Sequence, residues 1–345
     1  MHKKGTISGI YGAYYKIIPD LNPETELNAK LRGKLRLKKN KPEKLRLRHL
    51  LTAGDQVSFA SEGSEDTFID DLYPRKNILI RAGEYEAHAL GANLDRAVLI
   101  QSLVFPDIRA GFIDRFLVSC YAGNASPVIV FTKPDLAANT NPESLQIPDE
   151  YAKLGYTVFT LNLLETEESE SFKDFKSLCE TGVTLFAGNS GTGKSTIINR
   201  LFSKDIQKTG SISQVTGKGK HTTTNSRLFL SENHRARYID TPGVKEWGIA
   251  HLSPEDLYAS FPELSSYLQQ CRYKNCTHTE KSAGCRIQEI LQTSSGTNSA
   301  EETPISAERM KSFFSLMGSL QYSERIRRGD FIKATGRMKS GKIKL

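Results

Sequence analysis

The chain has few of the features that mark secreted or membrane proteins. It contains only five cysteines among 345 residues. No apolar run approaches the roughly 18 residues that a membrane-spanning helix needs, and the first five residues, Met-His-Lys-Lys-Gly, lack the apolar core of a secretory signal. These absences argue against a disulfide framework and against a membrane anchor. They predict a cytoplasmic protein that works under reducing conditions.

Three of the cysteines nevertheless lie close together in sequence, with a histidine among them. The cluster consists of Cys271, Cys276, His278 and Cys285. Three thiolates and one imidazole at this spacing suit a closed tetrahedral zinc site with no position left open for catalysis, and a reducing compartment disfavours the alternative of disulfides. Cys120 and Cys179 fall in apolar or helical stretches, where a buried small side chain is the default. The sequence therefore predicts one structural Zn²⁺.

Positive charge is concentrated at two places. The formal net charge is +8, yet residues 30–48 hold ten Lys and Arg against one acid, and residues 325–344 hold eight against one. A solvated charged face is one explanation. Two basic segments without an amphipathic anchor, however, favour RNA or ribosomal phosphate as a partner over a membrane.

The basic N-terminal block has a pattern typical of β-structure. In residues 30–38, Lys-Leu-Arg-Gly-Lys-Leu-Arg-Leu-Lys, basic and apolar residues alternate, so a strand there would bury leucines and present a cationic face. Glycines punctuate the block at positions 9, 12, 33, 54 and 63. We expect a small barrel of the OB type over residues 1–80, a fold that commonly binds oligonucleotides. Composition alone also allows an SH3-like barrel.

A phosphate-binding loop follows near the middle of the chain. The loop fits the pattern G-x-x-x-x-G-K-[ST] and consists of Gly188, Asn189, Ser190, Gly191, Thr192, Gly193, Lys194, Ser195 and Thr196. A strand-like run precedes it and a helical run follows, which is the context that the motif requires and that a chance glycine-rich turn lacks. The glycines let backbone N–H groups wrap a phosphate. Lys194 would bridge the β- and γ-phosphates, and Ser195 would hold Mg²⁺.

Another loop motif ends the strand-like run at residues 236–239. It reads Asp240-Thr241-Pro242-Gly243. Asp240 would hold Mg²⁺ through water, and the N–H of Gly243 would be free to touch a γ-phosphate. Alone this is a common turn sequence, but its position downstream of the phosphate loop favours the functional interpretation.

A guanine-reading signature precedes both motifs. A buried-strand run at residues 128–131 leads into Thr132, Lys133, Pro134 and Asp135. A carboxylate accepts the N1–H and N2–H₂ donors of guanine, whereas adenine has no N1–H, so Asp135 favours GTP over ATP. The usual signature is Asn-Lys-x-Asp, and the Thr132 hydroxyl cannot reproduce the paired bonds of an amide. The stem of Lys133 would lie along the base plane.

The order of these motifs is informative. Ordinary small GTPases begin with the phosphate loop and end with the guanine reader, but here the reader comes first. The sequence therefore predicts a circularly permuted α/β P-loop GTPase domain over residues 81–250. Residues 251–345 would form a small, mostly α zinc-binding domain with a basic tail. Apolar residues recur there at helical spacing, at Met310, Phe313, Phe314, Met317 and Leu320.

The segment between the phosphate loop and Asp240 contains a candidate switch. Residues 217–224 read Gly-Lys-Gly-Lys-His-Thr-Thr-Thr; a threonine there can sense the γ-phosphate through Mg²⁺, and we favour Thr223. A basic surface loop is the alternative. Many GTPases place a glutamine after D-x-x-G to orient water, but Val244 stands there, so intrinsic hydrolysis should be slow. His221 is the nearest group that can accept a proton near neutral pH, unless it is only an exposed loop histidine.

Segments along nearly the whole chain match one known family. They include the phosphate loop, the Cys/Cys/His/Cys spacing and residues 33–36, 53–57, 74–77, 92–95, 219–224 and 240–248. With these segments the chain resembles the RsgA (YjeQ/YloQ) family of ribosome-dependent GTPases. The resemblance implies an OB domain, a permuted GTPase domain and a zinc domain. It also implies late maturation of the small ribosomal subunit, with the rRNA as partner and hydrolysis stimulated by the subunit. In that family the histidine of G-x-H-T-T-T has been proposed to act in hydrolysis, which maps onto His221.

The chain departs from the family pattern in its base site. Thr132 replaces the usual asparagine, and Asn162 stands where the family has a serine in the second guanine-contact loop. Insertions at residues 21–26 and 38–44 enlarge the barrel loops. A P-loop ATPase acting on RNA, and a non-enzymatic GTP-binding rRNA scaffold, are the competing interpretations; Asp135 argues against the first and the intact phosphate loop against the second. A monomer is the default expectation.

Overall fold

A computed structural model of the chain defines the fold over most of its length. It describes residues 2–33, 35, 47–62, 66–83, 86–165, 169–202, 225–268, 270–274, 276, 278, 282–294 and 307–328. The chain divides into two compact units. The first comprises residues 1–81, 85–109 and 123–247, and the second comprises residues 82–84, 110–122 and 248–345.

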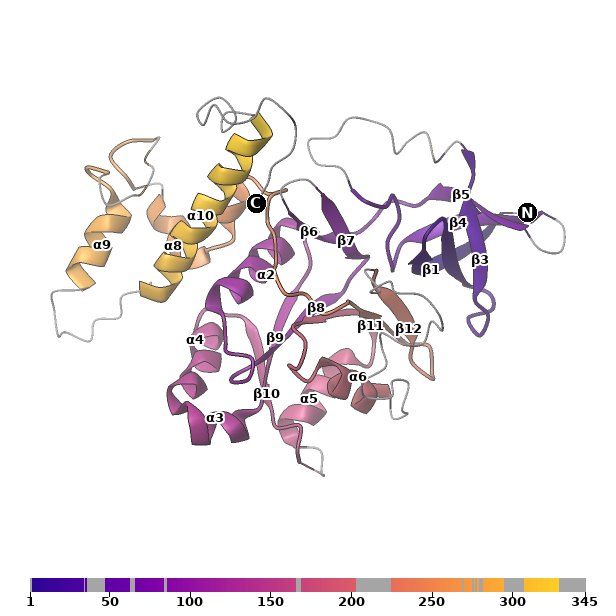
Figure 1. Ribbon diagram of the computed structural model, residues 1–345, viewed down its shortest axis with the longest axis horizontal. Helices are drawn as coiled ribbons and strands as arrows, with labels where there is room; N and C mark the ends of the chain where they lie inside the picture. Colours follow the sequence, from indigo (N-terminus) through magenta and orange to yellow (C-terminus); the bar gives the residue numbers. More distant parts are fainter. Residues whose placement is uncertain are drawn as a thin grey trace, which may run out of the picture. The chain divides into compact units, whose positions relative to one another are not determined.

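The first unit begins with a closed five-stranded barrel (Figure 1). Its strands are β1 (Lys3–Tyr11), β2 (Tyr14–Pro19), β3 (Leu27–Leu31), β4 (Gln56–Glu62) and β5 (Asp66–Leu72), and they close in the order β1-β2-β3-β5-β4. Side chains of a strand alternate between the two faces of the sheet. The inward set forms a core, and its members without exposed surface include Ile7, Ile17, Val57, Phe59 and Ile69. The predicted N-terminal barrel is confirmed.

The strand predicted over residues 30–38 is shorter than its pattern suggested. β3 ends at Leu31 because the chain turns there: the N–H of Leu35 donates to the carbonyl of Arg32 at 2.9 Å, and Arg32 Nε pairs with Asp70 Oδ1 at 2.5 Å. Leu35 is buried in the barrel core. The prediction for residues 36–38 falls outside the described residues.

A mixed six-stranded sheet follows the barrel. It contains β8 (Arg96–Ser102), β9 (Pro127–Thr132), β10 (Thr157–Leu161), β11 (Gly182–Gly188), β12 (Arg227–Leu230) and β13 (Ala236–Asp240), in the order β10-β9-β8-β11-β13-β12. Five strands are parallel and β12 is antiparallel to β13. In a parallel sheet the carboxyl ends of the strands meet at one edge, where ligands bind. The loops after β9, β11 and β13 therefore open at the same edge, although they are far apart in sequence.

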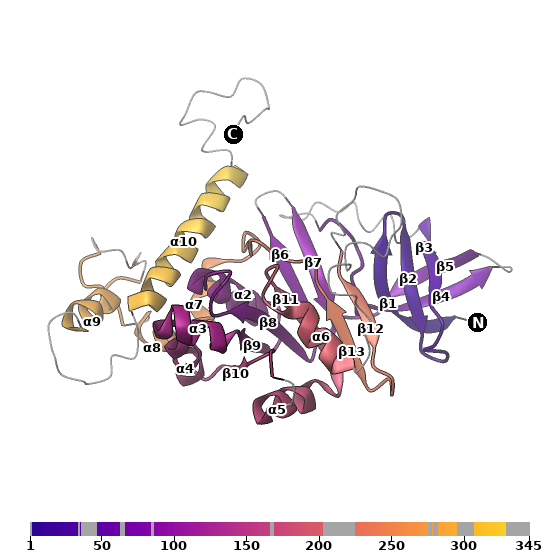
Figure 2. The same ribbon diagram turned by 60° about the horizontal axis from the view of Figure 1, so that its bottom comes forward.

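Helices of the first unit cover this sheet. They are α3 (Pro134–Thr140), the 3₁₀ helix η1 (Pro142–Gln146), α4 (Ile147–Lys153), α5 (Glu170–Cys179) and α6 (Lys194–Phe202). Ser169 caps α5 by accepting the Phe172 N–H, a bond that satisfies a free donor at the helix start. Phe172, Phe175 and Ile197 belong to one apolar cluster with residues of the sheet, so α5 and α6 lie on the same face of it (Figure 2). A two-stranded sheet of β6 (Ile78–Ala82) and β7 (Ala87–Ala92) connects the barrel to β8 in the chain.

The second unit is mostly helical over its described residues. It contains α2 (Ala110–Ala122), α7 (Pro254–Ala259), α8 (Pro262–Leu268), α9 (Arg286–Ser294) and α10 (Ala307–Arg328). Arg309 on α10 pairs with Asp114 on α2, and its Nε pairs with Glu263 Oε1 on α8 at 2.7 Å. The helical spacing noted in this region is confirmed, because Phe313 and its apolar neighbours on α10 are largely buried. No helix in the described part of the chain combines the length and apolar character needed to cross a membrane.

Candidate functional site

The phosphate loop joins β11 to α6 in a conformation that requires glycine. Gly191 and Gly193 have φ values of 81° and 89°, in the left-handed region that side chains disfavour. A Cβ on Gly188 would lie 2.5 Å from the carbonyl oxygen of Ile100. The loop therefore has the sharp turn and close backbone approach expected for an anion cradle. It leads into the start of α6 at Lys194, and the free N–H groups of a helix start favour a bound anion.

The loop after β13 lies directly on the phosphate loop. Lys194 Nζ forms an ion pair with Asp240 Oδ1, and both side chains are nine-tenths buried or more. The Val244 N–H donates to the Gly188 carbonyl at 3.2 Å, and a Cβ on Gly243 would lie 3.6 Å from the Ser190 nitrogen. The structure thus brings Lys194, Asp240 and Gly243 together, as the motif spacing predicted. Ser195 and Thr196 occupy the first turn of α6.

The residues of the guanine-reading signature occupy the end of β9 and the start of α3. Thr132 is fully buried, and its hydroxyl donates to the Thr192 carbonyl of the phosphate loop at 2.8 Å. Lys133 has a left-handed φ of 61°, and its Nζ donates to the Phe105 carbonyl. Asp135 lies partly exposed in the first turn of α3. No hydrogen bond or ion pair from the described residues reaches the Asp135 carboxylate.

A third loop, after β10, also reaches the phosphate loop. Asn162 Oδ1 accepts the Leu164 N–H at 3.1 Å, so this side chain shapes its own turn. A Cβ on Gly193 would lie 2.6 Å from Leu163 Cδ1, and Arg200 on α6 donates to the Leu163 carbonyl at 2.9 Å. The sequence motifs gave no indication of Leu163, Arg200 or Phe105. Leu163 and Phe105 make these contacts through backbone carbonyls and a methyl group, and the Arg200 guanidinium binds a backbone carbonyl that any residue carries.

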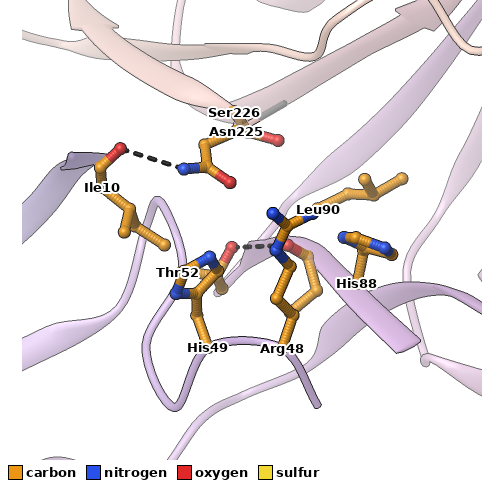
Figure 3. A pocket seen from close by; sticks show the side chains of 9 residues that line it. Ile10, Arg48, His49, Thr52, His88, Leu90, Asn225 and Ser226 are labelled. Carbon is orange, nitrogen blue, oxygen red and sulfur yellow. Dashed lines mark hydrogen bonds between the residues drawn. The ribbon is translucent and has the colours of Figure 1, made fainter. Parts of the chain in front are cut away.

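Two predicted residues, His221 and Thr223, lie outside the described residues. The nearest described residue is Asn225, and its Nδ2 donates to the Ile10 carbonyl of the barrel at 3.0 Å. This bond crosses a small pocket (Figure 3). The pocket is lined by Ile10, Arg48, His49, Thr52, His88, Ala89, Leu90, Asn225 and Ser226. Burial lowers the pKa of His88, with Glu86 opposing the shift. Asn225, the residue that follows the candidate switch segment, is therefore bound to the barrel.

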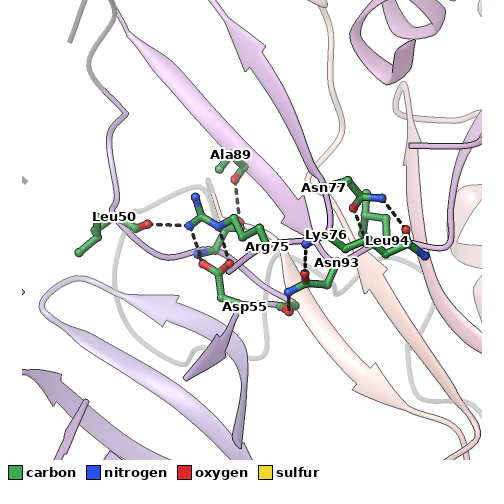
Figure 4. Close-up of polar contacts among 10 residues, drawn as sticks. Leu50, Asp55, Arg75, Lys76, Asn77, Ala89, Asn93 and Leu94 are labelled. Carbon is green, nitrogen blue, oxygen red and sulfur yellow. Dashed lines mark hydrogen bonds and ion pairs between the residues drawn. The ribbon is translucent and has the colours of Figure 1, made fainter. Parts of the chain in front are cut away.

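A buried polar network holds the barrel to the following segments (Figure 4). Arg75 donates twice to the Asp55 carboxylate, at 2.6 and 2.8 Å, and once to the Leu50 carbonyl at 2.8 Å. Asn93 Nδ2 donates to the Gly54 carbonyl at 2.9 Å, and its Oδ1 accepts the N–H of residue 76 at 2.8 Å. A Cβ on Gly54 would lie 2.2 Å from the Ala92 carbonyl oxygen. These contacts join the barrel to the segments around residues 75 and 93 within the first unit.

The predicted metal ligands converge in the second unit. Cys271 Sγ lies 3.5 Å from His278 Nδ1, Cys285 Sγ lies 3.6 Å from the same atom, and the two sulfurs are 4.0 Å apart. All four candidate ligand atoms, with Cys276 Sγ, lie within 4.8 Å of one another. Tetrahedral Zn²⁺ with ordinary bond lengths separates S from N by about 3.6 Å and S from S by about 3.8 Å. The donor set and its spacing therefore fit zinc.

Burial affects the two buried ligands in opposite ways. Burial lowers the pKa of His278, which keeps the imidazole in the neutral form that binds metals. Burial raises the pKa of the Cys285 thiol to about 11, so a nearby cation is needed to favour its thiolate. The Tyr258 ring packs edge-on against His278 at 5.8 Å between centroids, and Gln288 Nε2 donates to the His278 carbonyl at 2.9 Å.

Comparison with known proteins points to one family. A family model described as RsgA GTPase matches residues 72–250. The Small ribosomal subunit biogenesis GTPase RsgA of Porphyromonas gingivalis is 36% identical over 278 residues, which cover 78% of this chain and 85% of the relative. The protein named Small ribosomal subunit biogenesis GTPase RsgA 2 of Bacteroides thetaiotaomicron is 34% identical over 296 residues, covering 84% and 91%.

Solved structures share the fold. The crystal structure of YjeQ from Thermotoga maritima matches with a TM-score of 0.66 and 21% identity, covering 93% of this chain and 99% of that one. YloQ, whose structure is described as a circularly permuted GTPase, matches with a TM-score of 0.60 and 20% identity, covering 93% and 96%. The predicted architecture of a barrel, a permuted GTPase domain and a C-terminal Cys/His cluster is confirmed.

Proposed function

Because the chain belongs to the RsgA family of GTPases and is a GTP hydrolase, we propose that it hydrolyses GTP on the small ribosomal subunit during late maturation of that subunit. The names of the relatives from Porphyromonas gingivalis and Bacteroides thetaiotaomicron support the choice of subunit. The single observation that carries the nucleotide site is the convergence of three loops. The Lys194–Asp240 pair and the Thr132–Thr192 bond bring the phosphate loop, the loop after β13 and the base reader together.

In the proposed site, the backbone N–H groups of residues 188–196 bind the phosphates. Lys194 leaves Asp240 and moves to the β- and γ-phosphates, since a phosphate competes for the same ammonium. Ser195 and Asp240 are the residues that would hold Mg²⁺, which would offset the negative charge of the phosphates. Gly243 offers its N–H to the γ-phosphate, and Asp135 accepts the two donors of guanine.

Intrinsic hydrolysis in this proposal is slow. Val244 is 3% exposed and carries no group that could orient water. We assign that task to His221 and the sensing of the γ-phosphate through Mg²⁺ to Thr223. Both assignments follow from the sequence. The bond from Asn225 to the barrel connects their segment to the proposed RNA-binding part of the chain. Docking on the subunit would place His221 and Thr223 for catalysis and so raise the rate.

The barrel is the proposed rRNA-binding element. Basic side chains lie over aromatic rings on its strands: Lys16 over Tyr11 at 5.6 Å, Lys30 over Tyr14 at 5.4 Å and Arg32 over Phe68 at 5.5 Å. Such a surface can bind both the phosphate backbone and the faces of unstacked bases. In this proposal the chain consists of an OB domain (1–80), a permuted GTPase domain (81–250) and a zinc domain (251–345), and it acts as a monomer.

The Cys/His cluster is proposed to hold one structural Zn²⁺. Its support is the spacing of the four donors and the neutral state of His278. With four protein ligands, zinc would supply only structural stabilisation, by joining the segment at residues 271–278 to the start of α9. The ligands leave no position for substrate.

The nucleotide state would control binding to the subunit. The loop after β13 continues directly into residue 248, where the longest segment of the second unit begins. We expect GTP to favour a subunit-bound arrangement and hydrolysis to favour release, by shifting a two-state equilibrium. An identical domain orientation on the subunit with GDP and with a non-hydrolysable analogue would contradict this mechanism.

The deciding experiment measures GTP and ATP hydrolysis with and without small ribosomal subunits, at low and high salt. We expect GTP-selective turnover that rises with the subunit and falls with salt, because phosphate contacts are weakened by salt. Preference for ATP would favour an ATPase acting on RNA. Tight GTP binding without turnover under any condition would favour a non-enzymatic scaffold.

A base-exchange variant tests the reader itself. Asp135→Asn replaces an acceptor by an amide that can also donate, so the affinity for GTP should fall about tenfold or more. The affinity for XTP, which has a carbonyl at position 2, should rise. The control is Asp149→Asn on α4, a carboxylate in the first turn of another helix. Equal loss in both variants would contradict a base-reading role for Asp135.

A further inference from the structure

The hydrogen bond of Thr132 limits what this residue can do for the nucleotide. Its partner is the carbonyl oxygen of Thr192, at 2.8 Å, and a carbonyl can only accept. A hydroxyl has one hydrogen to donate, so the single donor of Thr132 is committed to the phosphate loop. An asparagine amide would keep a second N–H after making the same bond.

Both branches of the Thr132 side chain face the phosphate loop. A Cβ on Gly193 would lie 3.8 Å from Thr132 Cγ2 and 3.9 Å from its Oγ1, so the methyl group and the hydroxyl border the same glycine. Thr132 has no exposed surface. The Thr132 side chain therefore packs against the phosphate loop from the protein interior, whereas Asp135 is partly exposed.

The backbone of Thr132 is fixed on both sides. It pairs with Ser102 of β8 and with Leu161 of β10, and its carbonyl accepts the Leu103 N–H at 3.0 Å. Because the β-branched side chain also has restricted χ1 rotation, its hydroxyl cannot turn from Thr192 to a ligand without breaking this packing. The central strands of the sheet thus hold the hydroxyl in register with the loop.

Guanine presents N7 and O6 as acceptors, which need donors from the protein. Thr132 has none left. We propose that Thr132 is a positioning residue of the phosphate loop that makes no hydrogen bond to the base, so that guanine selectivity depends on Asp135. The proposal rests on the proposed GTP site. With threonine in place of asparagine, the hydrogen bond to the phosphate loop is kept and the hydrogen bond to the base is lost.

The test compares GDP with 7-deaza-GDP, in which a C–H replaces N7, by equilibrium competition on the full chain. Thr132→Val removes the hydroxyl at nearly constant shape and leaves the Thr192 carbonyl unpaired, which should weaken GDP binding about tenfold. The affinity for 7-deaza-GDP should fall by the same factor. The affinity for GMP, which lacks the β-phosphate that the loop wraps, should fall far less in this variant.

Matched variants separate positioning from general damage. Thr132→Ser keeps the hydroxyl and should stay close to wild type, whereas Thr140→Val, at a threonine that donates within α3 to Leu136, should change nothing. If Thr132→Val proves unfolded by circular dichroism, Thr132→Ala provides the same comparison with a smaller side chain.

Two results would overturn the inference. One is a valine variant that loses affinity for GDP but not for 7-deaza-GDP, which would show a bond to N7; the other is a variant with unchanged GDP affinity. Failure of the proposed function looks different, since wild-type protein would then bind no guanine nucleotide or would prefer ATP.

Discussion

The Asp55–Arg75 pair should be one of the strongest single contacts in the first unit. The Asp55 side chain has no exposed surface and that of Arg75 is 20% exposed. Arg75 makes three hydrogen bonds of 2.6 to 2.8 Å, two to Asp55 and one to the Leu50 carbonyl. Arg75→Met would leave the buried carboxylate with the Thr52 N–H, 2.8 Å from its Oδ2, as its remaining bond in this network.

The magnitude follows from burial. Breaking a buried ion pair by removing one partner costs about 3–5 kcal/mol, because an uncompensated charge stays inside. Arg75 is not fully buried, so we expect about 3 kcal/mol. The neighbouring residue offers a matched control: Lys76 Nζ pairs with Asp95 Oδ1 at 2.8 Å, but the two side chains are 61% and 38% exposed. Lys76→Met should therefore cost less than about 1 kcal/mol.

Thermal unfolding followed by near-ultraviolet circular dichroism measures the difference. For a unit of this size, about 3 kcal/mol lowers the midpoint by roughly 6–12 °C, whereas Lys76→Met should shift it by no more than a few degrees. Arg75→Lys should fall between them, because lysine keeps the charge but not the planar fork. Adding Asp55→Asn to Arg75→Met should recover part of the loss by removing the buried charge. Equal midpoints for Arg75→Met and Lys76→Met would refute the reasoning.

Two further predictions concern the second unit. Purified protein should contain one zinc per chain; Cys285→Ala should abolish it and Cys179→Ala, outside the cluster, should not, as measured by metal analysis and by the thiolate absorption of the cobalt form. Full metal content in Cys285→Ala would exclude the proposed ligand set. Burial also lowers the pKa of His251 to about 4, with Asp256 opposing. Below its unfolded value of about 6.5 the unfolded chain binds a proton that the folded chain excludes, so stability should fall from pH 6.5 to 4, by on the order of 3 kcal/mol for this residue. In His251→Gln, the free energy of unfolding measured by urea denaturation should change less between pH 6.5 and 4 than in wild type. Parallel plots of this free energy against pH for the two proteins would contradict the assignment.

Much of the nucleotide site could be predicted from sequence because its signals are local. The phosphate loop and the residues around Asp240 each specify a turn at a strand end within a few positions. Once both are placed at the carboxyl edge of a parallel sheet, their meeting at Lys194 and Asp240 follows. The metal cluster is similar, since its four ligands lie within one short stretch of chain.

Other features depend on contacts between distant residues and had no local signal. β3 ends early where the chain turns at Arg32, whose side chain pairs with Asp70, and Asp114 on α2 pairs with Arg309 on α10. The family resemblance included Asp55, Arg75 and Asn93 without a physical reason for any of them. The structure supplies one, because these residues form the buried network that joins the barrel to the rest of the first unit (Figure 4).

Circular permutation leaves the same loops at the carboxyl edge of the sheet but changes which segment of the chain follows each of them. The strand order β10-β9-β8-β11-β13-β12 places the base reader, the phosphate loop and Asp240 at one edge whatever their order in the chain. In this order the chain reaches Asp240 last and enters the longest segment of the second unit at residue 248. The segment that contacts the phosphate loop through Val244 and Gly188 is thus one of the covalent links to the second unit. A change in that contact on hydrolysis would act on the second unit through a few residues of backbone, without any intervening domain.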